Sequence, residues 1–210
     1  AKLSSQEHIL IYAGSGGVGT IAIQLAKHLG AYVTATTSTR NVNMVKELGS
    51  DKVIDYTEEN FEELGGQFDV VYDTLGGEYT LNSFKVLKPG GRIVSIAGDL
   101  DEITAQQLKL NRFIRFLLAL KAKKVTNAAS KLGASYRFLL MSPSGGQLKK
   151  LSELYESEKI KPVIDKTYSF EESIQAIKYL SQGHAKGKVV VKMLKSVSYT
   201  HLRAHETSRN

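Results

Sequence analysis

The chain has 210 residues, a length that suits one sizeable domain or one domain with an appendage. It contains no cysteine, which excludes disulfides, a thiolate nucleophile and cysteine-bound zinc. The five histidines show no metal-ligand spacing, and no apolar stretch approaches the roughly 20 residues that a membrane span needs. Its first residues do not resemble a signal peptide, so a reducing cytoplasm is the expected compartment.

The net charge is +7, from 28 basic and 21 acidic residues, and much of the excess lies between Lys109 and Lys131 without an acidic neighbour. Such a stretch suits nucleic acid or an anionic membrane surface. The simpler interpretation, which we favour, is two helices with a solvated basic face and no nucleic-acid partner. Their buried or subunit-facing side would then carry the apolar residues Phe113, Ile114, Phe116, Leu117, Leu118 and Leu120.

A β-α-β unit is predicted over His8 to Arg40. Residues 9–12 form an apolar run typical of a buried strand, and glycines follow at once. Apolar residues then recur at helical spacing from Ile21 to Leu29, Gly30 ends the helix, and residues 31–36 favour a second strand. The first turn of this unit therefore carries the pattern Gly14-x-Gly16-x-x-Gly19.

This glycine pattern indicates a dinucleotide site. We expect Gly14 to permit the bend, Gly16 to let a pyrophosphate approach the backbone, and Gly19 to allow close packing of helix and strand. The free N–H groups of the first helical turn, with the helix dipole behind them, would face the phosphates. A lone GxGxxG is a weak signal, but strand, turn, helix and strand occur here in the required order. A purely structural turn is the alternative, and a Walker loop is disfavoured because no lysine precedes Thr20.

The end of the second strand points to the cofactor's phosphate. An NAD site usually places an acidic residue there, yet no Asp or Glu occurs between the glycine pattern and Glu47. Threonine and serine hydroxyls precede Arg40, whose guanidinium can bind a 2′-phosphate through forked hydrogen bonds. We therefore predict NADP(H), with a merely solvated Arg40 as the alternative.

The rest of the chain alternates strands and helices, which is typical of an α/β fold with a parallel sheet covered on both faces. Expected strands are 52–56, 68–73, 92–97, 136–141 and 188–193, and expected helices are 41–48, 78–87, 144–157 and 171–181. A further helix capped by Thr57 would carry Phe61 and Leu64, and residues 98–132 are expected to be helical. Because ligands bind at the carboxyl ends of such strands, residues 73–77 and 97–98 are expected near the cofactor.

Six segments of this sequence resemble the medium-chain dehydrogenase/reductase superfamily, and most closely its zinc-free quinone oxidoreductase and 2-alkenal reductase branch. They are AGSGGVGTIAIQLAKHLGA, STRNVNMVKELGSDKVIDY, FDVVYDTLGG, LKPGGRIVSIAG, YRFLLMSPSGGQL and AKGKVVVKM. The resemblance implies a Rossmann doubly wound parallel sheet over residues 1–160. It also implies that residues 161–195 are a short remnant of a catalytic domain whose larger part precedes this fragment, and residues 196–210 are expected to be disordered or artefactual.

The resemblance also implies roles for individual residues. The pyrophosphate would lie on Gly16, Gly17 and Val18, within reach of Lys186 and Lys188. The adenosine 2′-phosphate would be surrounded by Ser38, Arg40 and Tyr56. Leu75 and Ala97 would lie along the ribose and nicotinamide, and the backbone of Phe138, Leu139 and Leu140 would hold the carboxamide. The strand at Phe138 to Met141 would form a homodimer interface.

The implied reaction passes a hydride from NADPH to a quinone or an α,β-unsaturated carbonyl compound, without zinc. No catalytic acid or base can be nominated, since substrate-facing residues would lie mostly in the other domain. Two alternatives remain open. One is a non-catalytic NADP-binding sensor or interaction module. The other is a short-chain dehydrogenase triad of Ser142, Tyr155 and Lys159, although the glycine spacing and the Asp73–Gly77 turn do not match that family.

Overall fold

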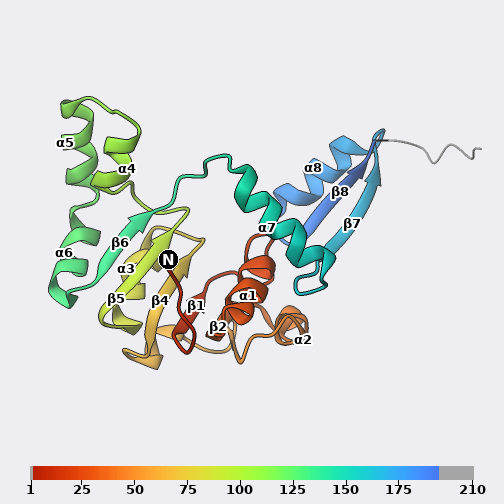
Figure 1. The fold of residues 1–210 in the computed structure, drawn as a ribbon, viewed down its shortest axis with the longest axis horizontal. Coiled ribbons are helices and arrows are strands. Elements are labelled where there is room, and N and C mark those ends of the chain that lie inside the picture. The colour runs from red at the N-terminus through yellow and green to blue at the C-terminus, as the bar shows by residue number, and fades with distance from the viewer. Residues whose placement is uncertain (1, 194–210) are drawn as a thin grey trace, which may run out of the picture.

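The computed structural model describes residues 2–193. Its main body is a six-stranded parallel sheet in the order β3-β2-β1-β4-β5-β6, and a second sheet pairs β7 with β8 (Figure 1). The six strands are β1 His8–Ile11, β2 Tyr32–Thr37, β3 Lys52–Asp55, β4 Phe68–Asp73, β5 Leu87–Ser95 and β6 Ser135–Phe138. Every neighbouring pair in this sheet is parallel, which confirms the predicted doubly wound α/β fold.

Helices connect the strands. They are α1 Gly19–His28, α2 Val42–Glu47, α3 Glu78–Val86, α4 Glu102–Gln107, α5 Arg112–Lys121, α6 Lys123–Leu132 and α7 Gly145–Glu156, with short 3₁₀ turns η1 Thr39–Asn41 and η2 Phe61–Leu64. The C-terminal unit consists of β7 Ile164–Ser169, α8 Ser173–Ser181 and β8 Lys188–Lys192.

Alternation along the strands builds two cores, one on each face of the sheet. Leu10 and Tyr12 pack with residues of α3 and α6, whereas Ile9 and Ile11 pack with residues of α1 and α2. Because successive side chains of a strand point to opposite faces, a continuous apolar run is what a sheet covered on both sides requires.

The order of the strands creates a crevice at the carboxyl ends of β1 and β4. These strands are neighbours, but the chain proceeds from β1 toward β2 and β3 on one side and from β4 toward β5 and β6 on the other. Such a reversal leaves room above the sheet between the two sets of loops, and it is where open α/β sheets bind ligands.

Three predicted boundaries are wrong. The strand expected at 136–141 ends at Phe138, because its partner β5 ends at Ser95 and offers no further pairing. The strand expected from residue 92 already begins at Leu87, with an irregular register opposite β4. The helix expected after Thr57 is only the 3₁₀ turn η2, which Asn60 caps by accepting from the Glu62 N–H.

The apolar side of α5 is not buried. No residue of this helix is buried, and Phe113 is 70% exposed. The prediction of a buried face is therefore wrong for this helix within the described residues, and a subunit-facing role stays a prediction.

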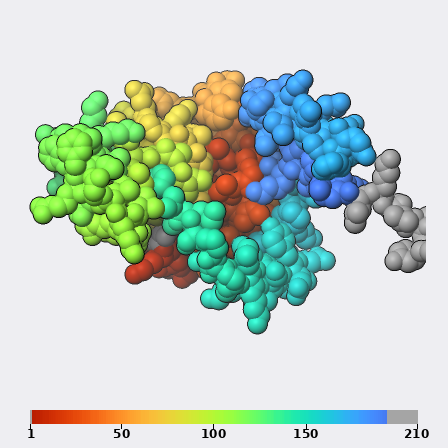
Figure 2. All heavy atoms as spheres, turned by 90° about the horizontal axis from the view of Figure 1, so that it is seen from above, coloured from red at the N-terminus to blue at the C-terminus, as the bar shows by residue number. Residues whose placement is uncertain are grey.

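Two contacts attach the C-terminal unit to the sheet domain. The buried Gln24 side chain of α1 donates to the Lys161 carbonyl at 3.0 Å and accepts from the Lys161 N–H at 2.8 Å. The Gly187 N–H donates to the Ser15 carbonyl at 2.9 Å, which sets the β8 approach loop against the turn after β1. Figure 2 shows this unit, in blue, against the red β1–α1 segment.

Candidate functional site

The glycine turn joins β1 to α1, and its first and last glycines are sterically required. A Cβ on Gly14 would lie 2.9 Å from the Ala35 Cβ of β2 and 3.1 Å from Cδ1 of Ile23 on α1. A Cβ on Gly19 would overlap the Ala13 carbonyl oxygen. Gly19, the first residue of α1, therefore lets the helix approach the end of β1 closely, as expected, and Gly14 lets β2 and α1 pack against the turn.

The middle of the turn forms an anion-binding surface. Val18 occupies the N-cap of α1 without a side-chain cap, and the first turn of the helix has no acidic residue. A Cβ on Gly17 would lie 3.0 Å from the Gly187 carbonyl oxygen and 3.3 Å from the Lys188 Nζ. Gly17 therefore lets the loop before β8 lie directly against the turn, and a pocket of about 370 Å³ is lined there by Gly17, Gly187 and Lys188. A helix N-terminus beside a lysine is an arrangement that fits a pyrophosphate.

The residues after β2 lie beside this turn. The Asn41 Nδ2 donates to Ser15 Oγ at 3.2 Å and to Ser38 Oγ at 3.4 Å, which links η1 to the glycine turn. Arg40 is exposed, and no carboxylate among residues 2–193 forms an ion pair with it. Ser38 and Arg40 therefore offer a hydroxyl and an unpaired guanidinium at the edge of the crevice.

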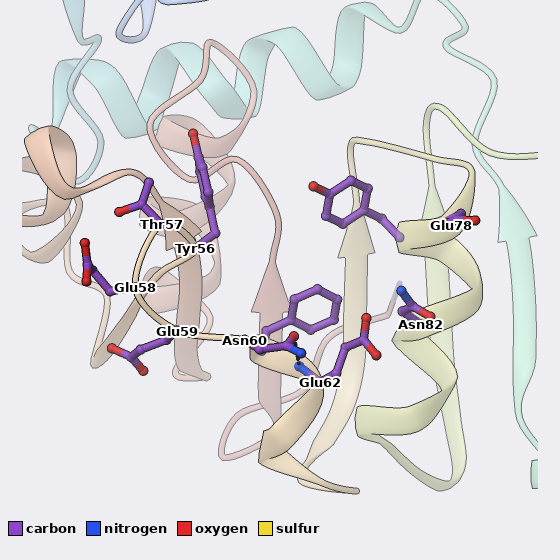
Figure 3. A pocket seen from close by; sticks show the side chains of 10 residues that line it. Tyr56, Thr57, Glu58, Glu59, Asn60, Glu62, Glu78 and Asn82 are labelled. Carbon is purple, nitrogen blue, oxygen red and sulfur yellow. Dashed lines mark hydrogen bonds between the residues drawn. The ribbon is translucent and has the colours of Figure 1, made fainter.

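Tyr56 follows β3 and lines a pocket of about 470 Å³ (Figure 3). Its N–H donates to the Thr37 carbonyl at 3.0 Å, so its backbone adjoins the end of β2. Tyr56 and Thr57 approach the pocket from one side and Glu78 and Asn82 of α3 from the other. The remaining lining residues are Glu58, Glu59, Asn60, Phe61, Glu62 and Tyr79. Ser38 and Arg40 do not line it, and its carboxylates make it a poor phosphate site.

A buried aspartate brings the next two loops together. Asp73, at the end of β4, is fully buried; Oδ1 accepts from the N–H groups of Leu75 at 2.9 Å and Gly76 at 2.8 Å. Its Oδ2 accepts from the hydroxyl of Ser95 at 2.8 Å, and Ser95 Oγ in turn accepts from the Ala97 N–H at 3.3 Å. A Cβ on Gly76 would overlap the Ala97 carbonyl, so Leu75 and Ala97 lie close together.

The organising role of Asp73 and Ser95 was missed by sequence reasoning. The only signal was an aspartate that ends an apolar strand and precedes Thr-Leu-Gly-Gly. Because the four donors around the Asp73 carboxylate come from three separate segments, only the folded chain reveals them.

Hydrogen bonds within the protein already occupy part of the backbone of residues 138–140, at the end of β6. The Phe138 N–H donates to Asp101 Oδ2 at 2.6 Å, and its carbonyl accepts from Thr104 Oγ1 at 2.9 Å. The Leu139 N–H donates to the Ser95 carbonyl at 2.8 Å. Of the three residues expected to hold a carboxamide, Leu140 alone keeps a free N–H donor among the described residues.

The segment leading into β8 places Lys188 at the glycine turn. The Lys186 N–H donates to Asp165 Oδ2 at 3.0 Å, and the Lys188 N–H donates to the Val163 carbonyl at 2.7 Å. With Gly187 bonded to Ser15, this loop is fixed beside the start of α1. The structure thus brings Lys188 to Gly17, as the resemblance implies.

The short-chain dehydrogenase triad is not assembled. Ser142 is exposed between β6 and α7, and within residues 2–193 no hydrogen bond joins its side chain to Tyr155 or Lys159. Lys159 instead lines a groove between α1 and α7, with Leu25 and Leu154. A tyrosine acid needs its lysine within hydrogen-bond reach, so this alternative lacks its geometry.

Two absences hold for the described residues. Residues 2–193 contain no group of three or more His, Cys, Asp or Glu side chains that could hold a metal ion. Within the same range, no helix combines the length and apolarity that crossing a membrane requires.

Comparisons with known proteins agree with this geometry. A family model described as zinc-binding dehydrogenase matches residues 48–191. The chain is 40% identical over 196 residues to the 2-methylene-furan-3-one reductase of Solanum lycopersicum, covering 91% of the chain and 42% of the relative. It is 37% identical over 194 residues to the chloroplastic NADPH-dependent alkenal/one oxidoreductase of Arabidopsis thaliana, covering 90% of the chain and 42% of that relative.

A comparison with solved structures also finds an oxidoreductase. The quinone oxidoreductase from Coxiella burnetii matches with a TM-score of 0.74 at 32% identity, over 92% of the chain and 55% of that protein. The chain thus spans about half the length of the proteins that it matches. Since the Arabidopsis relative is named chloroplastic, a cytoplasmic location for this chain stays a prediction.

Proposed function

Because this chain belongs to the zinc-binding dehydrogenase family, we propose that it is the cofactor-binding part of an NADPH-dependent reductase. The observation that carries this proposal is the uncapped, acid-free start of α1, which faces Lys188 across Gly17. An N-terminus of this kind attracts phosphate. The names of the two reductase and oxidoreductase relatives favour an enzyme over a non-catalytic sensor.

The phosphate-binding residues follow from the site. Gly17 and Val18 bind the pyrophosphate through backbone N–H groups, and Lys186 and Lys188 neutralise it. The Gly16 N–H donates to the Ala13 carbonyl at 2.9 Å, so Gly16 contributes by lacking a Cβ that would hold the phosphates away. Ser38 and Arg40 bind the 2′-phosphate. Two observations support this assignment: the Arg40 guanidinium is unpaired and lies beside the glycine turn, and the end of β2 has no acidic residue.

Tyr56 has a different role from the one that the resemblance implies. The pocket beside it combines aromatic faces with carboxylate and amide acceptors. This combination suits an adenine ring, which stacks on aromatic side chains and donates from its exocyclic amine. We therefore place Tyr56 toward the adenine rather than against the 2′-phosphate.

The nicotinamide end lies over β4, β5 and β6. Leu75 and Ala97 pack along the ribose and ring, and the Leu140 N–H with the Leu139 carbonyl orients the carboxamide. When bound, the reduced nicotinamide supplies a hydride for a quinone or an α,β-unsaturated carbonyl compound. The names of the Arabidopsis relative and of the Coxiella structure support these substrate classes, and the resemblance to the zinc-free branch supports a reaction without zinc.

The wider organisation is also proposed. Residues 1–160 form the cofactor domain, and residues 161–195 complete a second domain that this chain does not contain. Exposed apolar residues of α8 support this division: Ile174 is 68% and Ile177 is 67% exposed. The prediction for residues 196–210 lies outside the described residues. A homodimer would form through residues 138–141, at and just after the end of β6, which is one of the two edge strands of the sheet.

The test is the variant Arg40→Ala, titrated with NADPH and NADH by nicotinamide fluorescence. Losing a charge-assisted contact to the 2′-phosphate should weaken NADPH binding by about 10- to 100-fold and leave NADH binding unchanged. Arg112→Ala is the matched control, because Arg112 is exposed on α5 and far along the chain from the site. Equal loss for both cofactors, or no loss, would contradict the assignment of Arg40.

A further inference from the structure

Helix α5 turns an apolar stripe to the solvent. Its inner side is formed by Arg115 and Leu118, which are half-buried, and by the buried Ala122 just after the helix. An α-helix has about 3.6 residues per turn, so side chains three, four and seven positions apart share one side. The apolar stripe on the outer side follows this spacing and consists of four exposed residues, Phe113, Phe116, Leu117 and Leu120.

Contacts on both sides of α5 hold the stripe outward. Arg115 forms an ion pair with Glu102 of α4, and the Lys121 Nζ lies 3.0 Å from Asp99 Oδ1. The next helix, α6, is anchored because its Val125 belongs to the core beside α3. Figure 1 shows α4, α5 and α6 gathered at one end of the molecule, away from the C-terminal unit. The fold therefore presents the apolar stripe as part of the surface.

The apolar stripe lies between positive charges. Residues 103–152 contain ten lysine or arginine residues and no aspartate or glutamate. Arg112 begins α5, and Lys123 and Lys124 follow its end. None of these three side chains forms an ion pair within residues 2–193. A partner that matches this surface must accept apolar side chains and also offer negative charge.

A second copy of the chain does not meet both conditions. A two-fold symmetric contact through α5 would bring the same cations together. No carboxylate in residues 103–152 could pair with them, and the nearby Asp99 and Glu102 are already paired.

Two other occupants fit only half of the surface. Nucleic acid would pair with the cations but leave the leucines and phenylalanines in water. A membrane-spanning role is ruled out by length, since ten residues of helix extend about 15 Å and the bilayer core is about 30 Å thick. The surface of an anionic bilayer satisfies both conditions, because it offers acyl chains beneath charged headgroups.

We propose that α5 binds the surface of an anionic lipid bilayer. The apolar stripe enters the boundary between headgroups and acyl chains, and Arg112, Lys123 and Lys124 contact lipid phosphates. None of these residues belongs to the proposed cofactor site, so failure of either proposal leaves the other untouched.

The first test is sedimentation of the unaltered chain with lipid vesicles. The chain should bind phosphatidylcholine vesicles that contain about 30% phosphatidylglycerol about tenfold or more tightly than vesicles of phosphatidylcholine alone. Added salt should weaken this binding, because it screens the attraction between the cations and the headgroups. Absent binding, or equal binding to both kinds of vesicle, would overturn the proposal.

The apolar stripe is tested with the double variant Phe113→Ser, Phe116→Ser. Both side chains are exposed, so the fold should survive, but binding to the anionic vesicles should weaken about tenfold or more. The matched control is Ile174→Ser, Ile177→Ser, because these residues are similarly exposed on α8. The control should bind like the unaltered chain, and equal weakening in both double variants would overturn the assignment to α5.

The cations are tested with the double variant Lys123→Gln, Lys124→Gln. Each charge near an anionic surface contributes about fivefold to binding, so the pair should weaken it about 30-fold. Lys149→Gln, Lys150→Gln is the matched control, since it removes two adjacent exposed lysines from α7. An unchanged affinity of the Lys123 and Lys124 variant would contradict the proposed headgroup contacts.

Tryptophan fluorescence identifies the part of the chain that enters the lipid. The chain contains no tryptophan, so a single introduced one is an unambiguous reporter. The emission of Phe116→Trp should shift to shorter wavelengths on anionic vesicles, because the indole leaves water, whereas that of Ile177→Trp should not shift. The reverse pattern, or no shift in either variant, would overturn the proposal.

Two further outcomes would assign the surface to another partner. If the chain ignores vesicles and the Phe113 and Phe116 variant turns a dimer into a monomer in size-exclusion chromatography, a second copy covers α5. If the chain ignores vesicles but binds duplex DNA with a steep salt dependence that Lys123→Gln, Lys124→Gln reduces, the cations serve nucleic acid. Either result overturns the lipid assignment.

Discussion

The sheet domain and the C-terminal unit are both built from parallel strands linked by helical connections, yet they differ in how deeply their residues are buried. Leu10 and Ile11 of β1 are fully buried, each on its own face of the sheet. In residues 161–193, only Ala176 and Gly187 are buried. Apolar strands alone therefore do not form a buried core, because a parallel sheet needs helices on both of its faces. The C-terminal unit has only one helix for its two strands.

This difference explains how each region serves the site. The sheet domain can hold loops rigidly at its carboxyl edge because six paired strands fix their ends. A two-stranded sheet is marginally stable by itself, so the position of the C-terminal unit depends on its contacts with α1 and the glycine turn. We expect the sheet to provide the binding surface and the C-terminal unit to provide charges that close over it.

Gly19→Ala should have the largest effect on the part of the site that the sheet domain supplies. The new Cβ would overlap the Ala13 carbonyl, so the turn must shift and α1 with it. We expect a loss of about 3 kcal/mol in the free energy of unfolding, together with loss of cofactor binding. Urea unfolding and fluorescence titration measure the two effects.

Gly145→Ala is the control for that variant. Gly145 begins α7, and a Cβ there would meet no atom within 4 Å. Its unfolding free energy should stay within about 0.5 kcal/mol of the unaltered chain. A Gly19→Ala variant as stable as Gly145→Ala would contradict the close packing of α1 against the end of β1 at Gly19.

A smaller and more local effect is expected from Gln24→Met, which sharpens the comparison between the two regions. Methionine retains the packing volume but cannot pair with the N–H and carbonyl of Lys161. Because Lys161 is exposed, water can replace these partners, and we expect a cost of about 1–2 kcal/mol. Hydrogen exchange should accelerate in β7, α8 and β8 while the strands β1 and β4 keep their protection.

Gln147→Met, on the exposed surface of α7, is its matched control and should change neither region. Uniform acceleration of exchange in both regions of Gln24→Met would show that the C-terminal unit and the sheet unfold together. That result would contradict the view that the unit is held mainly by two local contacts.

Much of the fold followed from local pattern, because the apolar runs at residues 9–12 and 68–73 are long enough to specify strands buried on both faces. The glycine turn was predicted in place, and Gly19 does allow close packing of α1 against the end of β1. The packing of Gly14 against Ala35 was not predicted, because no spacing within the turn encodes its distance to β2. The strand after residue 135 was predicted too long, since its end is set by its partner at Ser95.

The site was less predictable than the fold. Residues near in sequence to the glycine turn were found, but the hydrogen bond from Gly187 to Ser15 depends on how the C-terminal unit docks. The Asp73 hydrogen bonds and the occupied backbone of Phe138 likewise arise between separate segments. Periodicity along one segment cannot report such contacts.

The most direct test of the central claim is a titration of the unaltered chain with NADPH and with NADH, followed by nicotinamide fluorescence. The account predicts saturable binding of both, with NADPH bound about 10- to 100-fold more tightly because of the 2′-phosphate. Equal affinity, or tighter binding of NADH, would contradict it.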